Sequence, residues 1–106
     1  MSNANTSTDR QTANTSPGQI TILRTPTVCT RRGRSRSSHF ADIKAGLFVK
    51  PVLIGLRATG TPDNEVDALI AARIAGKSDD QIRALVIKLE AARKTADQQL
   101  LLKGGA

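Results

Sequence analysis

The chain has 106 residues and a formal net charge of +7 at pH 7, from 16 basic and 9 acidic residues. This length allows one small domain with tails, and a single cysteine excludes a disulfide framework. One histidine, one cysteine and no glycine-rich phosphate loop leave no nucleophile–base pair, so we expect no enzyme. The same residues cannot form a four-ligand zinc shell, and we expect no metal site and no cofactor.

The positive charge is confined to one third of the chain. Residues 24–57 contain eight basic residues and one acidic residue, whereas residues 1–23 and 58–106 are each neutral. Surfaces that only face solvent usually mix both signs. Nucleic-acid-binding surfaces cluster Lys and Arg, because each phosphate contact releases counterions. A solvated basic loop without a partner is the alternative interpretation.

Residues 1–19 are rich in Asn, Thr and Ser and lack apolar periodicity, so we predict a disordered tail. This tail has no apolar segment of the kind that marks a signal peptide. No apolar run approaches the ~20 residues that a membrane helix needs. We therefore expect a cytoplasmic protein without a membrane partner. The apolar segment 20–23 follows the tail and could lie against the domain as a strand.

Two short helices are predicted in the most basic segment. The first covers residues 26–32, with Thr25 as its cap and Gly33 as its left-handed C-terminal residue. The second covers residues 36–45, with Ser35 as its cap. Two helices joined by so short a turn are typical of a helix-turn-helix.

The next segment changes from helical to alternating character. Pro51 blocks a helix, residues 52–54 favour a strand, and Gly55 permits a turn. We predict a β-hairpin with Leu56 and Arg57 near its tip.

A third helix is predicted after the hairpin, with Thr61 as its cap and acidic residues in its first turn that oppose the helix dipole. Its expected apolar stripe consists of Val66, Leu69, Ile70 and Ile74.

A last helix begins at Ser78, where "SDDQ" has the pattern of a capping box. Its apolar residues either fold back on the domain or pack against another subunit. We expect the second arrangement, with a homo-oligomer forming on DNA through Ile82, Leu85 and Leu89. The expected organisation is a tail (1–19), a DNA-binding domain (20–76), and a C-terminal helix with a frayed end (77–106).

This order of elements predicts a mainly α fold with a small β-hairpin, a winged helix-turn-helix plus a C-terminal helix. Residues 23–76 resemble the AlpA family of prophage and mobile-element regulators, which belongs with the excisionase-like and MerR-like winged helices. The resemblance is carried, in order, by "LRTPTV", "RSRSS", "IKAGLFVKPV", "GLRATG" and "EVDALIAARIAG". Ala41 stands where the family usually has arginine, and His39 and Asp42 stand where it usually has apolar residues.

The resemblance implies a sequence-specific double-stranded DNA-binding protein of a bacterial mobile element, associated with the nucleoid when bound. It implies a recombination directionality factor (excisionase), a transcriptional regulator, or both, with an integrase as a candidate partner. The residues that it places on the recognition-helix face are Arg36, Ser37, Phe40, Ala41 and Lys44. It also places Arg57 on the wing.

The candidate DNA contacts fall into three groups. The recognition-helix group is Arg34, Ser35, Arg36, Ser37, Ser38, Phe40, Ala41 and Lys44. The backbone group is Arg31, Arg32 and Lys50, and the wing group is Arg57 and Thr59. Arg36 and Ser37 are expected to reach base edges, because recognition helices read with their N-terminal residues and arginine reads guanine. Arg57 either enters the minor groove or covers its own domain.

Two questions stay open at this point. His39 and Asp42 are three residues apart and so share a helix face. They could pair, but we favour two exposed side chains. The alternative function is an RNA-binding or ribosome-associated basic protein, and a third class is a module that binds an acidic protein. Few aromatic residues argue against binding of single strands, which depends on stacking.

Overall fold

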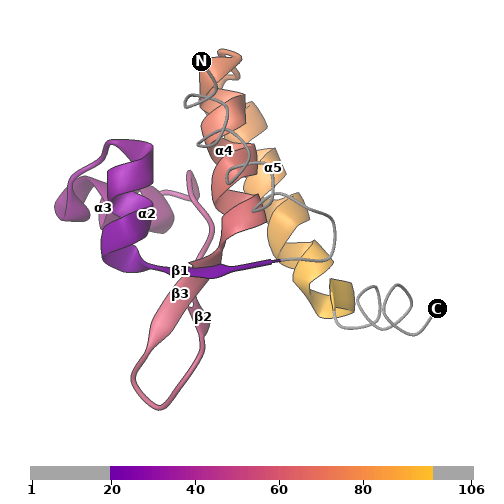
Figure 1. Ribbon diagram of the computed structural model, residues 1–106. Helices are drawn as coiled ribbons and strands as arrows, with labels where there is room; N and C mark the ends of the chain where they lie inside the picture. Colours follow the sequence, from indigo (N-terminus) through magenta and orange to yellow (C-terminus); the bar gives the residue numbers. More distant parts are fainter. Residues whose placement is uncertain (1–19, 97–106) are drawn as a thin grey trace, which may run out of the picture.

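The computed structural model describes residues 20–96, and the predicted tails at 1–19 and 97–106 lie outside the described residues. The described part is mainly helical with a small antiparallel sheet (Figure 1). The elements are β1 (Ile22–Arg24), α2 (Thr25–Arg32), α3 (Arg36–Lys44), β2 (Val52–Leu53), β3 (Thr59–Pro62), α4 (Asp63–Ile74), α5 (Asp79–Ala92) and the 3-10 turn η1 (Arg93–Thr95). The expectation of a mainly α chain with a small hairpin is confirmed at this level. None of the described helices is long and apolar enough to cross a bilayer.

The ends of the first two helices follow local chemistry. Helix α2 stops at Gly33, which has a φ of 68°, a left-handed value that glycine adopts without steric cost. Helix α3 starts at Ser35, whose Oγ accepts the backbone N–H of Ser38 at 3.1 Å. Both predictions are confirmed. The predicted cap at Thr25 is wrong, because α2 already includes Thr25 and no side chain caps it.

The sheet has the order β1-β3-β2, so the hairpin β2–β3 gains β1 as a third strand. Gly60 lies opposite both Arg24 and Val52 in the middle of the sheet. A Cβ atom at Gly60 would overlap the Ile22 side chain and lie 2.9 Å from the Leu23 carbonyl oxygen. Only glycine therefore allows β1 to approach β3 so closely.

Strand β3 continues directly into α4, which corrects the prediction that Thr61 caps this helix. Thr61 lies in β3 opposite Leu23. Pro62 holds the N-cap position of α4, and no side chain caps this helix. The link to the chain before β1 is made by Asp63. Its backbone N–H donates to the Thr21 carbonyl at 2.8 Å, and its Oδ1 accepts the Thr21 N–H at 3.2 Å.

One hydrophobic core joins the helices. Its fully buried members are Val28 of α2, Phe48 and Val49 after α3, Val66 and Leu69 of α4, and Ile82 and Val86 of α5. Helices α4 and α5 lie side by side, and α2 and α3 stand across from them (Figure 1). Ile74 is 82% exposed, so its predicted place in the buried stripe is wrong. It is the last residue of α4.

Helix α5 is an integral part of this core, which corrects the expected subunit contact. Ile82 is 1% exposed and has no surface to offer a second chain. Leu85 and Leu89 are half-buried and pack against the same cluster. The apolar stripe of α5 therefore folds back on its own domain, as the alternative interpretation had it. Self-association stays a prediction, but Ile82 cannot contribute to it, because it is buried in its own domain.

Candidate nucleic-acid interface

Helix α3 has two chemically different faces. The outward face consists of Arg36, Ser37, Phe40, Ala41 and Lys44, all of them exposed. Their spacing of one, three and four residues places them on one side of a helix. These are the residues that the family resemblance implied for the recognition face. The guanidinium of Arg36 lies 5.4 Å from the centre of the Phe40 ring, so these two side chains cover adjacent parts of the surface.

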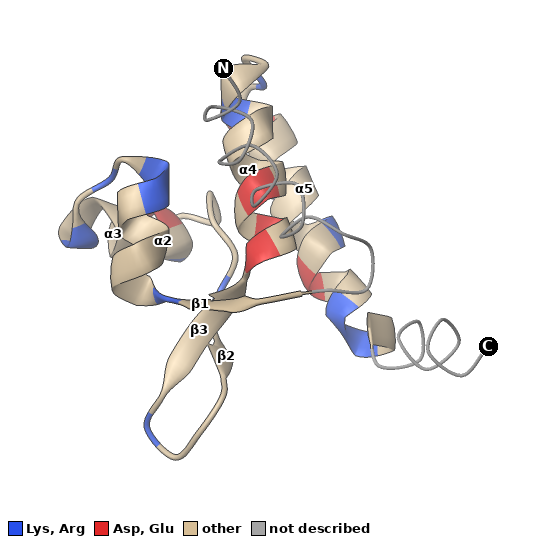
Figure 2. Ribbon diagram, viewed as in Figure 1, with Lys and Arg blue, Asp and Glu red and all other residues tan. Residues whose placement is uncertain are grey.

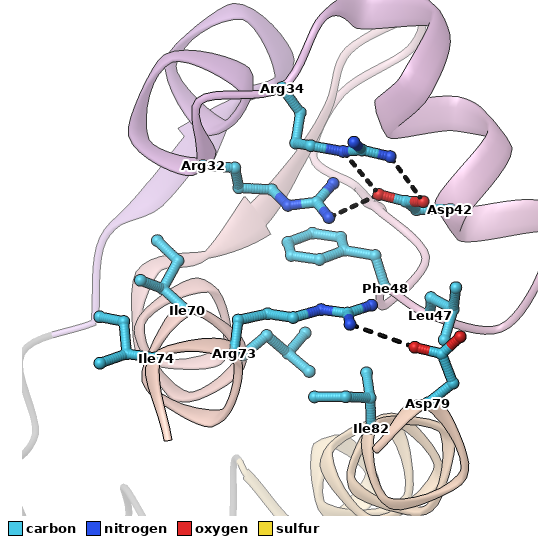
Figure 3. Close-up of a pocket in the computed structure, with 11 residues that line it drawn as sticks. Arg32, Arg34, Asp42, Leu47, Phe48, Ile70, Arg73, Ile74, Asp79 and Ile82 are labelled. Atoms are coloured by element: carbon cyan, nitrogen blue, oxygen red, sulfur yellow. Dashed lines mark hydrogen bonds and ion pairs between the residues drawn. The ribbon is translucent and has the colours of Figure 1, made fainter. Parts of the chain in front are cut away.

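The inward face of α3 carries His39 and Asp42, which are 2% and 8% exposed. Our expectation that both are exposed is wrong. They are buried because α2 and the turn after it supply two arginines as partners. Arg32 Nη2 donates to Asp42 Oδ2 at 2.7 Å, and Arg32 Nη1 lies 2.8 Å from His39 Nδ1. Arg34 completes the set with two parallel bonds to Asp42, at 3.1 and 3.0 Å (Figure 3).

We call Arg32, Arg34, His39 and Asp42 the inner polar cluster. It lies on the ring of Phe48, whose centroid is 4.1 Å from the Arg32 guanidinium and 5.1 Å from the His39 ring centroid. Burial of a charge is costly unless it is paired and hydrogen-bonded. In residues 20–96 no buried side-chain nitrogen or oxygen lacks a hydrogen-bond partner, so this condition is met.

The electrostatics of the inner polar cluster keep Asp42 charged and His39 neutral. Burial by itself would raise the pKa of the Asp42 carboxyl, but the hydrogen bonds and charges of Arg32 and Arg34 outweigh it and lower that pKa. Burial lowers the pKa of His39, the nearby Arg32 charge lowers it further, and Asp42 opposes both only in part. The hydrogen bond from Arg32 requires a neutral imidazole, because His39 Nδ1 must act as the acceptor.

The inner polar cluster changes the status of several predicted DNA contacts. The Arg32 side chain is only 8% exposed and is held by Asp42, so the predicted phosphate contact of Arg32 is wrong. Arg34 lies in the turn before α3 begins, which corrects its assignment to the recognition helix. Ser35 is likewise the cap residue, with its Oγ engaged by Ser38. Arg31 is half-exposed and pairs with Asp67 of α4 at 2.6 Å.

A second set of cations, all from residues 24–57, has no acidic partner within the described part of the chain. Its members, which we call the outer cations, are Arg24, Arg36, Lys44, Lys50 and Arg57. All five side chains are exposed. They lie on α3, at the sheet and on the hairpin, while acidic residues gather at the start of α4 (Figure 2). Most of the basic residues of segment 24–57 are therefore available to bind an anionic partner.

The start of the hairpin is held by helix α5 and the turn η1 that follows it. The backbone N–H of Lys50 donates to Glu90 Oε2 at 2.8 Å, and the Lys50 carbonyl accepts from Arg93 Nη2 at 2.7 Å. Arg93 also forms a salt bridge of 2.6 Å with Glu65, which is buried. Sequence reasoning missed Arg93 and took Glu65 only as a dipole partner, because the two residues are far apart in the chain. At the other end of the hairpin, Thr59 is half-buried at the start of β3, opposite Leu53.

A groove of about 560 Å³ separates the α2–α3 turn from α4 and α5. Arg32, Arg34 and Asp42 line one wall, and Arg73 crosses the groove to donate to Asp79 at 3.1 Å (Figure 3). The remaining lining is apolar, with Leu47, Phe48, Leu69, Ile70, Ile74 and Ile82. Its arginines are already neutralised by internal carboxylates, so the outer cations are the better candidate for binding a polyanion.

Between residues 20 and 96, no three side chains of the metal-binding types lie together closely enough to hold an ion. No protein-family model matches the chain, and no curated protein or solved structure is significantly similar to it.

Proposed function

We propose that the chain is a winged helix-turn-helix protein that binds double-stranded DNA in a sequence-specific manner. In this proposal α3 enters the major groove and the β2–β3 hairpin is the wing. The observation that carries it is the outward face of α3, where Arg36 and Lys44 stand without an acidic partner among the described residues. An α-helix fits the major groove of B-DNA, and such a face is what a recognition helix presents.

The roles of individual side chains follow from their places on α3. Arg36 is the first residue of the helix, the region from which recognition helices reach base edges. Its guanidinium can bind guanine O6 and N7 in a bidentate manner, and the exposed side chain of Phe40 suits a thymine methyl group. Lys44, two turns further on, is placed for a phosphate. Ala41 leaves room between them.

The charge distribution supports a polyanion as the ligand. The outer cations all come from residues 24–57, whereas four acids of α4 and α5 pair with the basic residues Arg31, Arg73, Arg83 and Arg93. Binding through such cations releases counterions from DNA and weakens steeply with salt.

The resemblance to the AlpA family supports a more specific role for the same surface. We propose a regulator of a bacterial mobile element that acts as an excisionase, as a transcriptional regulator, or in both ways. It would act in the cytoplasm, associated with the nucleoid, and an integrase is the proposed protein partner. Assembly of several copies on neighbouring DNA sites would raise the affinity of each.

A competition experiment with a matched pair of variants tests this proposal. A labelled duplex, selected by the wild-type chain from a random-sequence pool, is challenged with duplex DNA, single-stranded DNA and structured RNA. We expect duplex DNA to compete best. Lys44→Ala should weaken duplex binding, whereas Lys88→Ala, an exposed lysine of α5 without an ion pair in residues 20–96, should not. Equal effects of the two variants, or preferred binding of structured RNA, would reject the proposal in favour of general polyanion binding or of the RNA-binding alternative.

A further inference from the structure

The tip of the hairpin carries the most exposed large apolar side chain in residues 20–96. Leu56 is 94% exposed, and Leu53 on the adjoining strand is 72% exposed. The N–H of Ile54 donates to the carbonyl of Ala58 at 2.8 Å, and this bond closes the loop at its base. Leu56 is the middle residue between these two, so it stands at the apex. The loop extends away from the helices (Figure 1).

The apex combines an apolar side chain with a cation. Arg57 is the next residue, it is exposed, and residues 51–60 contain no acid. Single leucines on a surface are common and need no explanation. An apex leucine beside an unshielded arginine is a more specific combination. Proteins that read the minor groove place arginine in it and insert apolar wedges, leucine among them, between base steps.

Charge decides which partner suits this apex. The apex residues Leu56 and Arg57 belong to residues 24–57, which hold the entire excess positive charge of the chain. A second copy docked on the hairpin through the same surface would bring like charges together. A duplex brings phosphates to the outer cations on α3 and on the hairpin at the same time, and so is complementary to both.

We propose that Leu56 is a wedge that enters the minor groove beside Arg57, partly unstacks one base step and kinks the bound duplex. This inference rests on the proposed function and adds a residue and a DNA deformation to it. Wedges of this kind kink DNA by about 20–90°. Pyrimidine–purine steps unstack most easily, so a TA or CA step is expected beneath the apex.

The experiment measures bending and unstacking on the duplex selected from the random pool. Dyes at the two ends report the bend by energy transfer, and 2-aminopurine placed along the flanking minor groove reports unstacking by its fluorescence. The variants are Leu56→Ala and, as the matched control, Leu53→Ala, which removes an exposed leucine from the same hairpin. Circular dichroism verifies that both variants are folded.

The wild type and Leu53→Ala should shorten the end-to-end distance and brighten 2-aminopurine at one step. Leu56→Ala should lose both signals while it still binds the duplex in a manner that depends on Lys44. A wild type that binds without a bend, or a Leu56→Ala protein that bends DNA like the wild type, overturns the wedge and leaves the proposed function intact. Equal losses in the two variants also overturn the assignment to Leu56. A wild type that binds no duplex overturns the proposed function itself, and the wedge with it.

Discussion

Four arginines of residues 24–57 form two groups with opposite roles in the structure. Arg32, whose side chain is buried, and Arg34, whose side chain is half-exposed, share the carboxylate of Asp42. Arg36 and Arg57 are exposed and pair with no acid between residues 20 and 96. The two groups are adjacent in sequence, since only Ser35 separates Arg34 from Arg36. A basic segment therefore does not form a single binding surface. The acidic residues that pair with some of its cations decide which other cations remain available to a partner.

The inner group allows polar residues to occupy buried positions that apolar residues would otherwise fill. The face of α3 that turns toward Phe48 carries His39 and Asp42, and the arginines pay the cost of burying them. Such an arrangement fixes the turn between α2 and α3, because Arg32 at the end of α2 and Arg34 in the turn both bind the Asp42 carboxylate of α3. The ion pairs of Asp42 on the inward face of α3 thereby hold the outward face of the same helix in place.

The largest expected effect comes from removing the shared acid. Asp42→Ala leaves Arg32 buried without its carboxylate, and we expect a loss of about 3–5 kcal/mol in the free energy of unfolding. Urea denaturation followed by circular dichroism measures it. Asp80→Ala is the matched control, because Asp80 pairs with Arg83 on the surface and its loss should leave stability unchanged. A small effect of Asp42→Ala would show that the inner polar cluster is dispensable.

Substitutions in the outer group should weaken DNA binding and leave the stability of the fold unchanged. Arg36→Ala is expected to cost about 1–3 kcal/mol in affinity at the selected site, with a smaller loss on random duplex. Fluorescence anisotropy on the two duplexes measures this difference. The free energy of unfolding should not change, in contrast to Asp42→Ala. An equal loss on both duplexes would make Arg36 a phosphate contact and not a base reader.

The sequence predicted the elements well where local chemistry decides them. The stop at Gly33, the cap at Ser35 and the capping box at Ser78 need only neighbouring atoms, and all three are confirmed. The hairpin with Leu56 and Arg57 near its tip is also present. The failed cap at Thr61 has a tertiary cause, since pairing with β1 extends the strand up to the helix.

The candidate site was predicted less completely, because side-chain partners depend on the fold. Periodicity cannot tell that Arg32 reaches Asp42 or that Arg93 reaches Glu65, since neither pair shares a helix. One signal was available: Asp42 is the single acid among the eight bases of residues 24–57. An isolated acid in a basic segment, on the same helix face as His39, predicts an internal ion pair.

The wing offers a smaller test of the outer group. Arg57→Ala should weaken binding chiefly where the selected site is flanked by a narrow, A·T-rich minor groove, because such grooves attract arginine most strongly. Titration of duplexes with A·T-rich and G·C-rich flanks measures the difference. The loss should be less than that of Arg36→Ala, which also removes base readout. An unchanged preference for A·T-rich flanks would remove Arg57 from the interface.

The smallest expected effect is the pH dependence of stability that comes from His39, which is neutral in the folded chain. Because burial and the Arg32 charge lower the pKa of His39 below 6.5, the unfolded chain binds this proton more readily than the folded one. Stability should therefore be complete above pH 6.5 and fall as the pH drops through the lower folded pKa. Asp42, whose pKa is lowered from 3.8, adds a loss of the same sign only in stronger acid.

Urea denaturation between about pH 7.5 and 5.5 thus isolates the imidazole, which is the only one in the chain. His39→Gln keeps an acceptor for Arg32 without titrating, and its stability should vary less over this range. If the wild type and His39→Gln respond equally to acid, the imidazole titrates as freely as an exposed one and the inner polar cluster does not exclude its proton.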